Sequence, residues 1–420
     1  MSLPAPAAGP APVPAAGPFG RPAPARAPGV LYISYDGMLE PLGQSQVISY
    51  LELLSGDARL HILSFEKPAD WADVARRGAL AERLARAHIA WHPLTYHKAP
   101  TLPATLFDIA QGLAVATWLA ARHGLRIVHA RSYIPALIGW LVKLLTGARL
   151  IFDMRGFWAD ERVDGGIWPA GGGLYRGVKR IERVMLRGAD HIVTLTHASV
   201  GVIAKLGGPR PAPITVIPTC ADLDRFSSVT GAARVAPFTL GYVGSIGTWY
   251  LFDEVLACFR LIRERRPEAK MLVVNRGEQA LVRSSMAAAG IPESAVEITA
   301  CDHAGVPAMI RRMSAGAAII RPVFSKLASA PTKLAEYLGC GIPCLGNVGV
   351  GDMELMLERE GGGVALHEFT PAERIRAVDQ LLFLCDDPQT AAHCRAVALK
   401  HFSITTGAAA YRAIYAELAL

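Results

Sequence analysis

The sequence predicts an α/β fold of two doubly wound, Rossmann-like domains that face each other across a cleft. From residue 29 onward, short apolar runs typical of strands alternate with helical patterns, and this rhythm stops in a polar stretch and then starts again. Strands separated by helices are typical of parallel βαβ units. The chain has 420 residues, of which 51% are hydrophobic, so it is long enough to bury two cores.

The first domain is expected over residues 29–226. Residues 1–28 are dominated by Pro and Ala and lack the unbroken apolar core of a signal peptide, so we expect a disordered tail there. The strands of the first domain are predicted at residues 30–34, 60–64, 127–130, 150–153, 191–194 and 214–217.

The second domain is expected over residues 238–400, after a linker of polar and small residues at 227–237. Its strands are predicted at residues 239–243, 271–275, 296–299 and 317–320. Open parallel sheets bind ligands beyond the carboxyl ends of their strands. We therefore look for chemistry in the loops that follow these strands.

Composition excludes several classes of protein. The seven cysteines show neither zinc-site nor disulfide-framework spacing, which favours buried free thiols in a reducing cytoplasm. Lys143 and Arg149 interrupt the longest apolar candidate, residues 134–152, so no membrane span is predicted. The net charge of +7 favours anionic partners but does not by itself separate phosphates, nucleic acid and membranes.

Residues 331–343, PTKLAEYLGCGIP, have the pattern of a helix that holds a nucleotide-sugar at its first turn. Ser329 and Pro331 favour a helix start. The unpaired N–H groups and positive dipole of such an end, from Thr332 and Lys333, suit a pyrophosphate. Glu336 lies about one and a half turns inside, where its carboxylate can accept hydrogen bonds from a ribose diol. The alternative is an ordinary amphipathic helix with an exposed glutamate.

This segment resembles the second half of the E-x₇-E signature of retaining GT-B glycosyltransferases, the family 4-like class that includes many bacterial polysaccharide transferases. Glu336 matches the second glutamate of the signature, whereas Ala328 stands where the first one is expected. In the family that first glutamate contacts the transferred sugar, so the sugar contact is unassigned here. The resemblance implies a GT-B fold, a nucleotide-diphosphate sugar as donor, with UDP or GDP preferred, and no cofactor or metal.

Two glycine loops match the phosphate-facing loops of the same family. Gly43 lies in the loop after the first strand, and Gly244 and Ser245 follow the first strand of the second domain. Family members carry an arginine and a lysine soon after the second loop, and this chain has neither. Arg321, Lys326 and Lys333 are expected to supply the missing charge, unless they are surface cations without a ligand. The spacing G-x-x-G-x-x-G argues against a dehydrogenase.

A dense polar patch follows two strands of the first domain. His129 and Arg131 end one strand, and the next strand is followed by Arg155, Trp158, Asp160 and Glu161. Such groups are costly to bury without partners, so we expect them to line a polar cleft rather than a core. The region resembles the acceptor and donor-sugar side of the family, in which a histidine often occupies roughly the position of Arg155. The carboxylate spacing fixes no octahedral metal site.

Displacement at an anomeric carbon with a diphosphate leaving group would require mainly electrostatic stabilisation. We assign the catalytic contacts to Arg155, His129, Lys326 and Arg321, with the donor also held by Ser329 and by the start of the helix at Thr332. The acceptor hydroxyl would lose its proton to the departing phosphate, so no protein nucleophile is needed. Retention of configuration follows from the resemblance alone.

A cationic stripe is predicted on the helical segment at 171–188, which places five basic residues on one face and Val178, Ile181 and Met185 opposite. The basic residues are Arg176, Lys179, Arg180, Arg183 and Arg187. Such a helix suits an anionic membrane surface beside a lipid-linked acceptor, or else is a solvated helix packed by its apolar side. Aromatic residues do not interleave with these charges, so a nucleic-acid surface is not expected.

The resemblance extends over nearly the whole chain after the tail. VIPTCADLDRF at 216–226 resembles the crossing segment between the domains, and 401–420 resembles the terminal helix that returns to the first domain. We expect a cytoplasmic glycosyltransferase, peripheral to the membrane, that acts in surface polysaccharide or glycoconjugate synthesis on a glycan or lipid-linked acceptor. The alternatives are a nucleotide-sugar 2-epimerase of GT-B type and a non-catalytic binding subunit.

Overall fold

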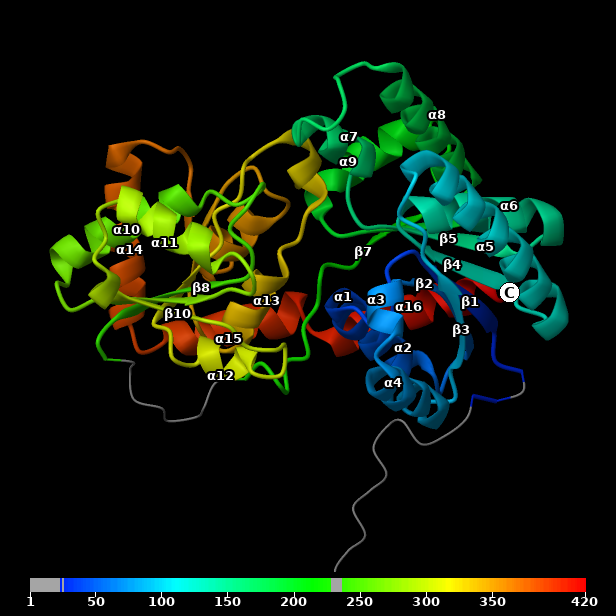
Figure 1. Ribbon diagram of the computed structural model, residues 1–420, viewed down its shortest axis with the longest axis horizontal. Coiled ribbons are helices and arrows are strands. Elements are labelled where there is room, and N and C mark those ends of the chain that lie inside the picture. Colours follow the sequence, from blue (N-terminus) through cyan, green and yellow to red (C-terminus); the bar gives the residue numbers. More distant parts are fainter. Residues whose placement is uncertain (1–22, 25, 228–235) are drawn as a thin grey trace, which may run out of the picture.

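The computed structural model describes residues 23–24, 26–227 and 236–420. Two parallel sheets form two lobes that lie side by side, and helices cover both faces of each sheet (Figure 1). This confirms the predicted α/β fold of two doubly wound, Rossmann-like domains. Most of the expected tail at 1–28 and most of the expected linker at 227–237 lie outside the described residues.

The first sheet has seven parallel strands in the order β3-β2-β1-β4-β5-β6-β7. The strands are β1 (Gly29–Ser34), β2 (Arg59–Glu66), β3 (Ala90–Thr95), β4 (Ile127–Arg131), β5 (Arg149–Met154), β6 (His191–Thr194) and β7 (Ile214–Val216). Because β1 pairs with both β2 and β4, the strand order reverses at this point of the sheet. A ligand crevice is expected at such a switch point, beyond the carboxyl ends of the strands.

The helices of the first lobe pack on both faces of this sheet. They are α1 (Pro41–Gly43), η1 (Gln44–Ile48), α2 (Ser49–Leu54), α3 (Pro68–Trp71), α4 (Val74–Arg86), α5 (Thr101–His123), α6 (Tyr133–Thr146), α7 (Trp158–Asp164), α8 (Gly173–Gly188) and α9 (His197–Gly207). One buried apolar cluster contains residues of α2 and α4, and a second cluster contains residues of α5, α6 and α8 on the opposite face.

The second sheet has six parallel strands in the order β10-β9-β8-β11-β12-β13. The strands are β8 (Thr239–Val243), β9 (Lys270–Val274), β10 (Val296–Thr299), β11 (Ala315–Ala317), β12 (Cys344–Asn347) and β13 (Gly363–Leu366). The helices are α10 (Phe252–Arg265), α11 (Gln279–Ala288), η2 (Glu293–Ala295), α12 (Val306–Ile310), η3 (Phe324–Ala328), α13 (Thr332–Gly339), η4 (Leu355–Arg359), α14 (Pro371–Asp386), α15 (Thr390–His401) and α16 (Ile404–Leu418).

The structure contains three strands that the sequence did not predict: β3, β12 and β13. Strand β3 is a half-exposed edge strand that contains Pro93, so it lacks the buried apolar run that marks the central strands. Strand β12 contains Gly346, where a Cβ would come within 2.3 Å of Met353. Strand β11 begins two residues earlier than the predicted strand at 317–320.

Helix α16 crosses from the second lobe and packs against α2 in the first, where Figure 1 shows it in red. Two buried polar contacts fix it there. The Tyr415 hydroxyl lies 2.7 Å from Nδ1 of His129, and the Tyr411 hydroxyl donates to Oδ2 of Asp153 at 3.2 Å. The end of the chain thus ties both lobes together beneath β4 and β5.

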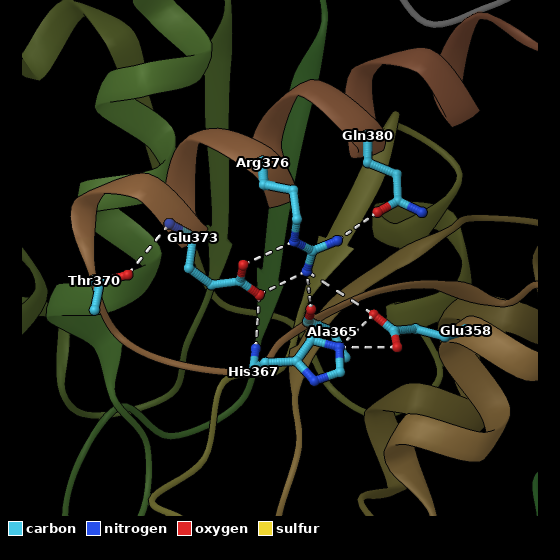
Figure 2. A network of polar contacts seen from close by, with 7 residues as sticks. All are labelled: Glu358, Ala365, His367, Thr370, Glu373, Arg376 and Gln380. Carbon is cyan, nitrogen blue, oxygen red and sulfur yellow. Dashed lines mark hydrogen bonds and ion pairs between the residues drawn. The ribbon is translucent and has the colours of Figure 1, made fainter.

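The start of α14 is fixed at the far side of the second sheet by the network in Figure 2. Thr370 caps the helix by accepting from the backbone N–H of Glu373 at 3.3 Å. Arg376 donates to Glu373 and to the carbonyl oxygen of Ala365, which belongs to β13. The bond from Arg376 is the main reason why the pKa of Glu373 falls to about 2. The network holds α14 in place against β13.

One helix among the described residues, α5, is long and apolar enough to cross a membrane by length and composition. The prediction of no span rested on uninterrupted apolar runs, and α5 did not meet that criterion because Asp108 interrupts it. Asp108 is fully buried and accepts hydrogen bonds from Tyr35 and His97. The inner side of α5 therefore packs against the core of the first domain.

We predict that Asp153→Asn lowers the free energy of unfolding by about 3 kcal/mol, because it leaves buried cations without their counter-charge. Asp153 is 1% exposed and lies 3.5 Å from Arg155 and 3.6 Å from Nε2 of His129. Burial opposes its ionisation, yet Arg155, His129 and Arg131 hold its pKa well below the usual range. Urea unfolding measured at neutral pH tests the prediction.

The matched control is Asp57→Asn, which removes an exposed partner of Arg412 on α16 at 2.6 Å. An exposed pair of this kind contributes less than about 1 kcal/mol. Equal losses in the two variants would contradict a structural role for the buried network.

Candidate active site

The predicted donor helix is α13, and it begins beside a cavity of about 430 Å³. Gln44 and Gln46 line this cavity from the first lobe, and Thr332 and Glu336 line it from the second. Pro331 precedes the first residue of the helix, as the sequence indicates. The helix start therefore faces a hollow between the domains that is large enough for part of a nucleotide.

Lys333, in the first turn of α13, is the most unusual charged group of this site. Its side chain is 6% exposed, and its Nζ atom has no hydrogen-bond partner. The ammonium lies over two aromatic rings, 4.3 Å from the ring centroid of Tyr242 and 3.9 Å from that of Tyr250. Burial lowers its pKa to about 7. Aromatic faces stabilise a cation only partly, so an anion that bound beside this ammonium would stabilise it further.

Glu336 lies one turn further along α13 and is also buried, at 6% exposure. Burial raises the pKa of its carboxyl to about 7, and the charges of Lys333 and Arg225 reduce that rise. Since Glu336 lines the cavity, a ligand that donates hydrogen bonds to its carboxylate would stabilise the charged form. The alternative of an exposed glutamate on an ordinary surface helix is wrong for this residue.

The glycine loop after β8 lies directly against Lys333. Gly244 has φ = +106°, a conformation that favours glycine, and a Cβ there would lie 3.6 Å from Nζ of Lys333. The side chain of Ser245 donates to Glu278, which also accepts from the backbone N–H of Ile246 and from Asn275. The loop is therefore held in a fixed shape by Glu278. Sequence reasoning missed Glu278 and Asn275, although both follow the carboxyl end of β9.

Three residues that were predicted to contact the donor near α13, namely Arg321, Lys326 and Ser329, have surroundings that differ from one another. Arg321 is exposed. Nζ of Lys326 lies 2.6 Å from Glu161 of the first lobe and 3.9 Å from the ring centroid of Trp249. Ser329 is half-buried, and its backbone N–H donates to the carbonyl of Lys326. The structure thus joins Lys326, predicted as a catalytic contact, and Glu161, predicted with Arg131, Trp158 and Asp160 on the acceptor side, in one ion pair across the domain boundary.

Ala328, at the position of the first glutamate of the signature, is 1% exposed and belongs to the apolar cluster of the first lobe. A carboxylate there would enter this apolar cluster, which also contains Phe157. The interface between the lobes thus explains why this chain has a small apolar residue at 328.

The expectation that His129 and Arg131 line a polar cleft is wrong. They are 1% and 5% exposed, and Nε2 of His129 and Nε and Nη1 of Arg131 are buried without a hydrogen-bond partner in the described part of the chain. His129 contacts Tyr415 and Asp153, and Arg131 lies 3.6 Å from Asp36. The Arg155 side chain is 13% exposed and pairs with Asp153 in the same network. These polar residues at the strand ends have partners from distant parts of the chain, which a sequence pattern does not reveal.

Asp160 is also buried, since it accepts from Tyr175 at 2.7 Å and from Lys179 at 2.9 Å. The Trp158 ring meets that of Trp168 edge to face and is tilted against that of Tyr133, with ring centroids 5.3 and 5.8 Å away. No group of three metal-ligating side chains occurs in the described part of the chain.

Helix α8 presents four of the five predicted basic residues to solvent, and the prediction is wrong for the fifth, Lys179. Lys179 is 8% exposed and pairs with Asp160 and Glu182, so it faces the protein. Ile181, predicted on the packed side, is 42% exposed among the arginines. The outer face of α8 therefore mixes arginine and apolar side chains.

Gly43 has a packing role in the structure. It is buried in α1, where a Cβ would come within 2.2 Å of the carbonyl oxygen of Gly37. The loop that contains Gly37 is itself held by Glu66, which accepts from the backbone N–H of Met38 at 2.8 Å. The glycine allows α1 to approach this loop closely. Glu66, at the end of β2, is a further residue that sequence reasoning missed.

Lys333 and Glu336 should give the stability of the protein a characteristic dependence on pH. Between pH 7 and 10.5 the folded protein binds fewer protons at Lys333 than the unfolded chain, so stability rises with pH in that window. Between pH 4.5 and 7 it binds more protons at Glu336, so stability falls as pH rises. Lys333 destabilises the fold fully below pH 7 and Glu336 fully above it, so their combined destabilisation is greatest near neutral pH.

We predict that Lys333→Met abolishes the rise in the unfolding midpoint above pH 7, and that Glu336→Gln abolishes the fall below it. Thermal unfolding across the pH range measures both effects. The matched control is Lys270→Met, which changes an exposed lysine of the same domain and should keep the rise. An unchanged pH profile in Lys333→Met would show that this amine is not desolvated.

Comparison with known proteins supports the fold at two levels. Residues 52–220 match the family model described as "Glycosyl transferase 4-like domain". No curated protein matches the sequence. Among solved structures, Anabaena HepE in complex with UDP and glucose aligns with a TM-score of 0.63 at 15% identity, over 92% of this chain and 99% of that one.

Two further structures show how widely this fold is shared. The sucrose-phosphate synthase of Thermosynechococcus elongatus aligns with a TM-score of 0.71 at 14% identity, over 93% of this chain and 99% of that one. A putative UDP-N-acetylglucosamine 2-epimerase from Listeria monocytogenes aligns with a TM-score of 0.59 at 15% identity, over 93% and 97% of the two chains. Likeness at this level of identity shows the fold alone. The match over residues 52–220 and the likeness of nearly the whole chain to these structures agree on one architecture, and the chain has the two-domain GT-B fold.

Proposed function

We propose that the protein transfers a sugar from a nucleotide-diphosphate sugar to a hydroxyl group of a glycan or lipid-linked acceptor. The observation that carries the proposal is the unpartnered, buried ammonium of Lys333 at the start of α13, beside Gly244 and the cavity-lining Glu336. A diphosphate would supply the missing anion, and a ribose diol would supply donors to Glu336. A UDP-sugar is the first donor to test, since HepE was solved with UDP and glucose.

In the proposed reaction, the bond between the anomeric carbon and the diphosphate oxygen breaks, and a bond to the acceptor oxygen forms. The acceptor proton passes to the departing phosphate. Lys333 and the N–H groups at the start of α13 would stabilise the negative charge that develops on the leaving group. Retention of configuration remains part of the proposal through the resemblance to the E-x₇-E class.

The remaining assigned residues have roles that follow from their positions. Lys326 is held by Glu161, so we propose that this pair sets the approach of the two lobes and that Lys326 meets the phosphates only when the pair opens. Arg155 and His129, joined through Asp153, would position the loop after β5 rather than contact the sugar directly. We also propose a cytoplasmic enzyme of polysaccharide or glycoconjugate synthesis, peripheral at an anionic membrane through the exposed arginines of α8.

We predict that one nucleotide among UDP, GDP, ADP and TDP raises the thermal midpoint selectively. Loss of a charge-assisted contact in Glu336→Ala or Lys333→Met should weaken that binding by about tenfold or more. Glu264→Ala, which changes an exposed glutamate of α10, is the matched control and should bind normally. A shift that persists unchanged in both site variants would place the donor elsewhere.

An epimerase that acts on a nucleotide-sugar is the second candidate, because the Listeria structure shares the fold. Incubation with the preferred donor alone separates the two functions. A transferase leaves the donor sugar unepimerised and consumes it only with an acceptor. Conversion of the donor to its epimer without an acceptor would overturn the transferase proposal, and nucleotide binding without any turnover would favour a non-catalytic subunit.

A further inference from the structure

Helix α5 exposes a stripe of apolar side chains between two exposed polar residues near its ends, Thr101 and Arg122. Six exposed positions recur every three or four residues along it, and none of them is polar: Pro103, Phe107, Ala110, Ala114, Trp118 and Ala121. Phe107 is 54% exposed and Trp118 is 60% exposed. A surface helix of a globular protein normally turns polar residues outward, so this face is unusual. Contiguous exposed apolar surface of this kind marks an interaction site.

The apolar surface continues onto neighbouring helices. Helix α5 packs against α6, and α6 packs against α8, so the three helices form one layer on the same side of the first sheet (Figure 1). At the end of α6, Leu144 and Leu145 are 63% and 66% exposed. Ile181 and Val184 of α8 are 42% and 39% exposed. All three helices therefore present large apolar side chains outward.

Positive charge borders this layer at α8. Four exposed arginines lie on its outer face, and none of them forms an ion pair within the described part of the chain: Arg176, Arg180, Arg183 and Arg187. Side chains of this length can hold their charge at the level of lipid phosphates while the apolar residues beside them go deeper. Apolar surface edged with unpaired arginines has the chemistry of a site for anionic lipid.

We propose that the outer surface of α5, α6 and α8 docks on an anionic lipid bilayer, with the apolar stripe of α5 entering the interface and the α8 arginines contacting lipid phosphates. This inference extends the proposed electrostatic contact of α8 by adding a penetrating helix, and it does not depend on the identity of the donor. The stripe spans 19 residues, about 28 Å at 1.5 Å per residue. It therefore provides a long, nearly straight edge for a flat surface.

Charge favours a bilayer over a second copy of the chain. Two copies that met through the same surface would bring their unpaired arginines together, whereas an anionic headgroup layer would neutralise them. A contact with lipid would then have two separable parts. Attraction between arginines and headgroups is screened by salt, and burial of apolar side chains is not.

The test is sedimentation of the full chain with vesicles of equal parts phosphatidylcholine and phosphatidylglycerol, at low and high salt. The wild type should bind at low salt and keep a measurable fraction at high salt. Phe107→Ser with Trp118→Ser should weaken binding by about tenfold or more and remove the salt-resistant fraction. Arg180→Gln with Arg183→Gln should weaken binding roughly thirtyfold at low salt.

The matched control is Leu281→Ser with Phe383→Ser, which changes two exposed apolar residues of the second domain, 50% and 73% exposed. This control should bind vesicles like the wild type. Circular dichroism and the nucleotide-induced thermal shift confirm that each variant is folded and keeps its donor site. Wild-type binding in the α5 variant would overturn the proposal, as would a dimer of the wild type that the α5 substitutions dissociate.

Discussion

The site depends on one physical constraint, the burial of two ionisable side chains on α13 with too few partners for their charges. Lys333 has two aromatic faces but no hydrogen-bond acceptor, and Glu336 has a cavity beside it. Desolvation shifts the pKa values of both groups to about 7, from opposite directions. A protein without a ligand to match these groups would gain nothing from such an arrangement, since an unpaired buried charge destabilises the fold.

The two sheets explain how this constraint is met structurally. Parallel strands gather their following loops at one edge, so the β8 loop with Gly244 and the start of α13 meet beside the first lobe. The lobes are then held by polar contacts on both sides of the interface. Thr196 donates to the carbonyl of Leu327, Asp352 accepts from the first N–H groups of α9, and α16 closes the opposite side. The stable frame allows the site itself to carry the destabilising groups.

The sequence predicted the fold class and most strands of both sheets, because central parallel strands are buried on both faces and have continuous apolar runs. It also identified α13, through Pro331 and Glu336. The edge strand β3 and the glycine-containing β12 were not predicted, because packing, rather than apolar patterning, defines them. The burial of His129, Arg131 and Asp160 was not predicted either. Their partners, Tyr415, Asp36 and Lys179, are distant in sequence or lie on other elements. Pattern shows which residues are polar, but only the fold shows which of them are paired.

The most direct test of the central claim is calorimetry of UDP binding at pH 8 in buffers of different ionisation enthalpy. An arriving diphosphate should raise the pKa of Lys333, so the wild type should take up close to one proton per UDP, by a rough estimate, and Lys333→Met should take up none. If another nucleotide proves to be preferred, it replaces UDP in the same measurement. Binding with equal proton uptake in both proteins would contradict the account, because the diphosphate would then not lie against this amine.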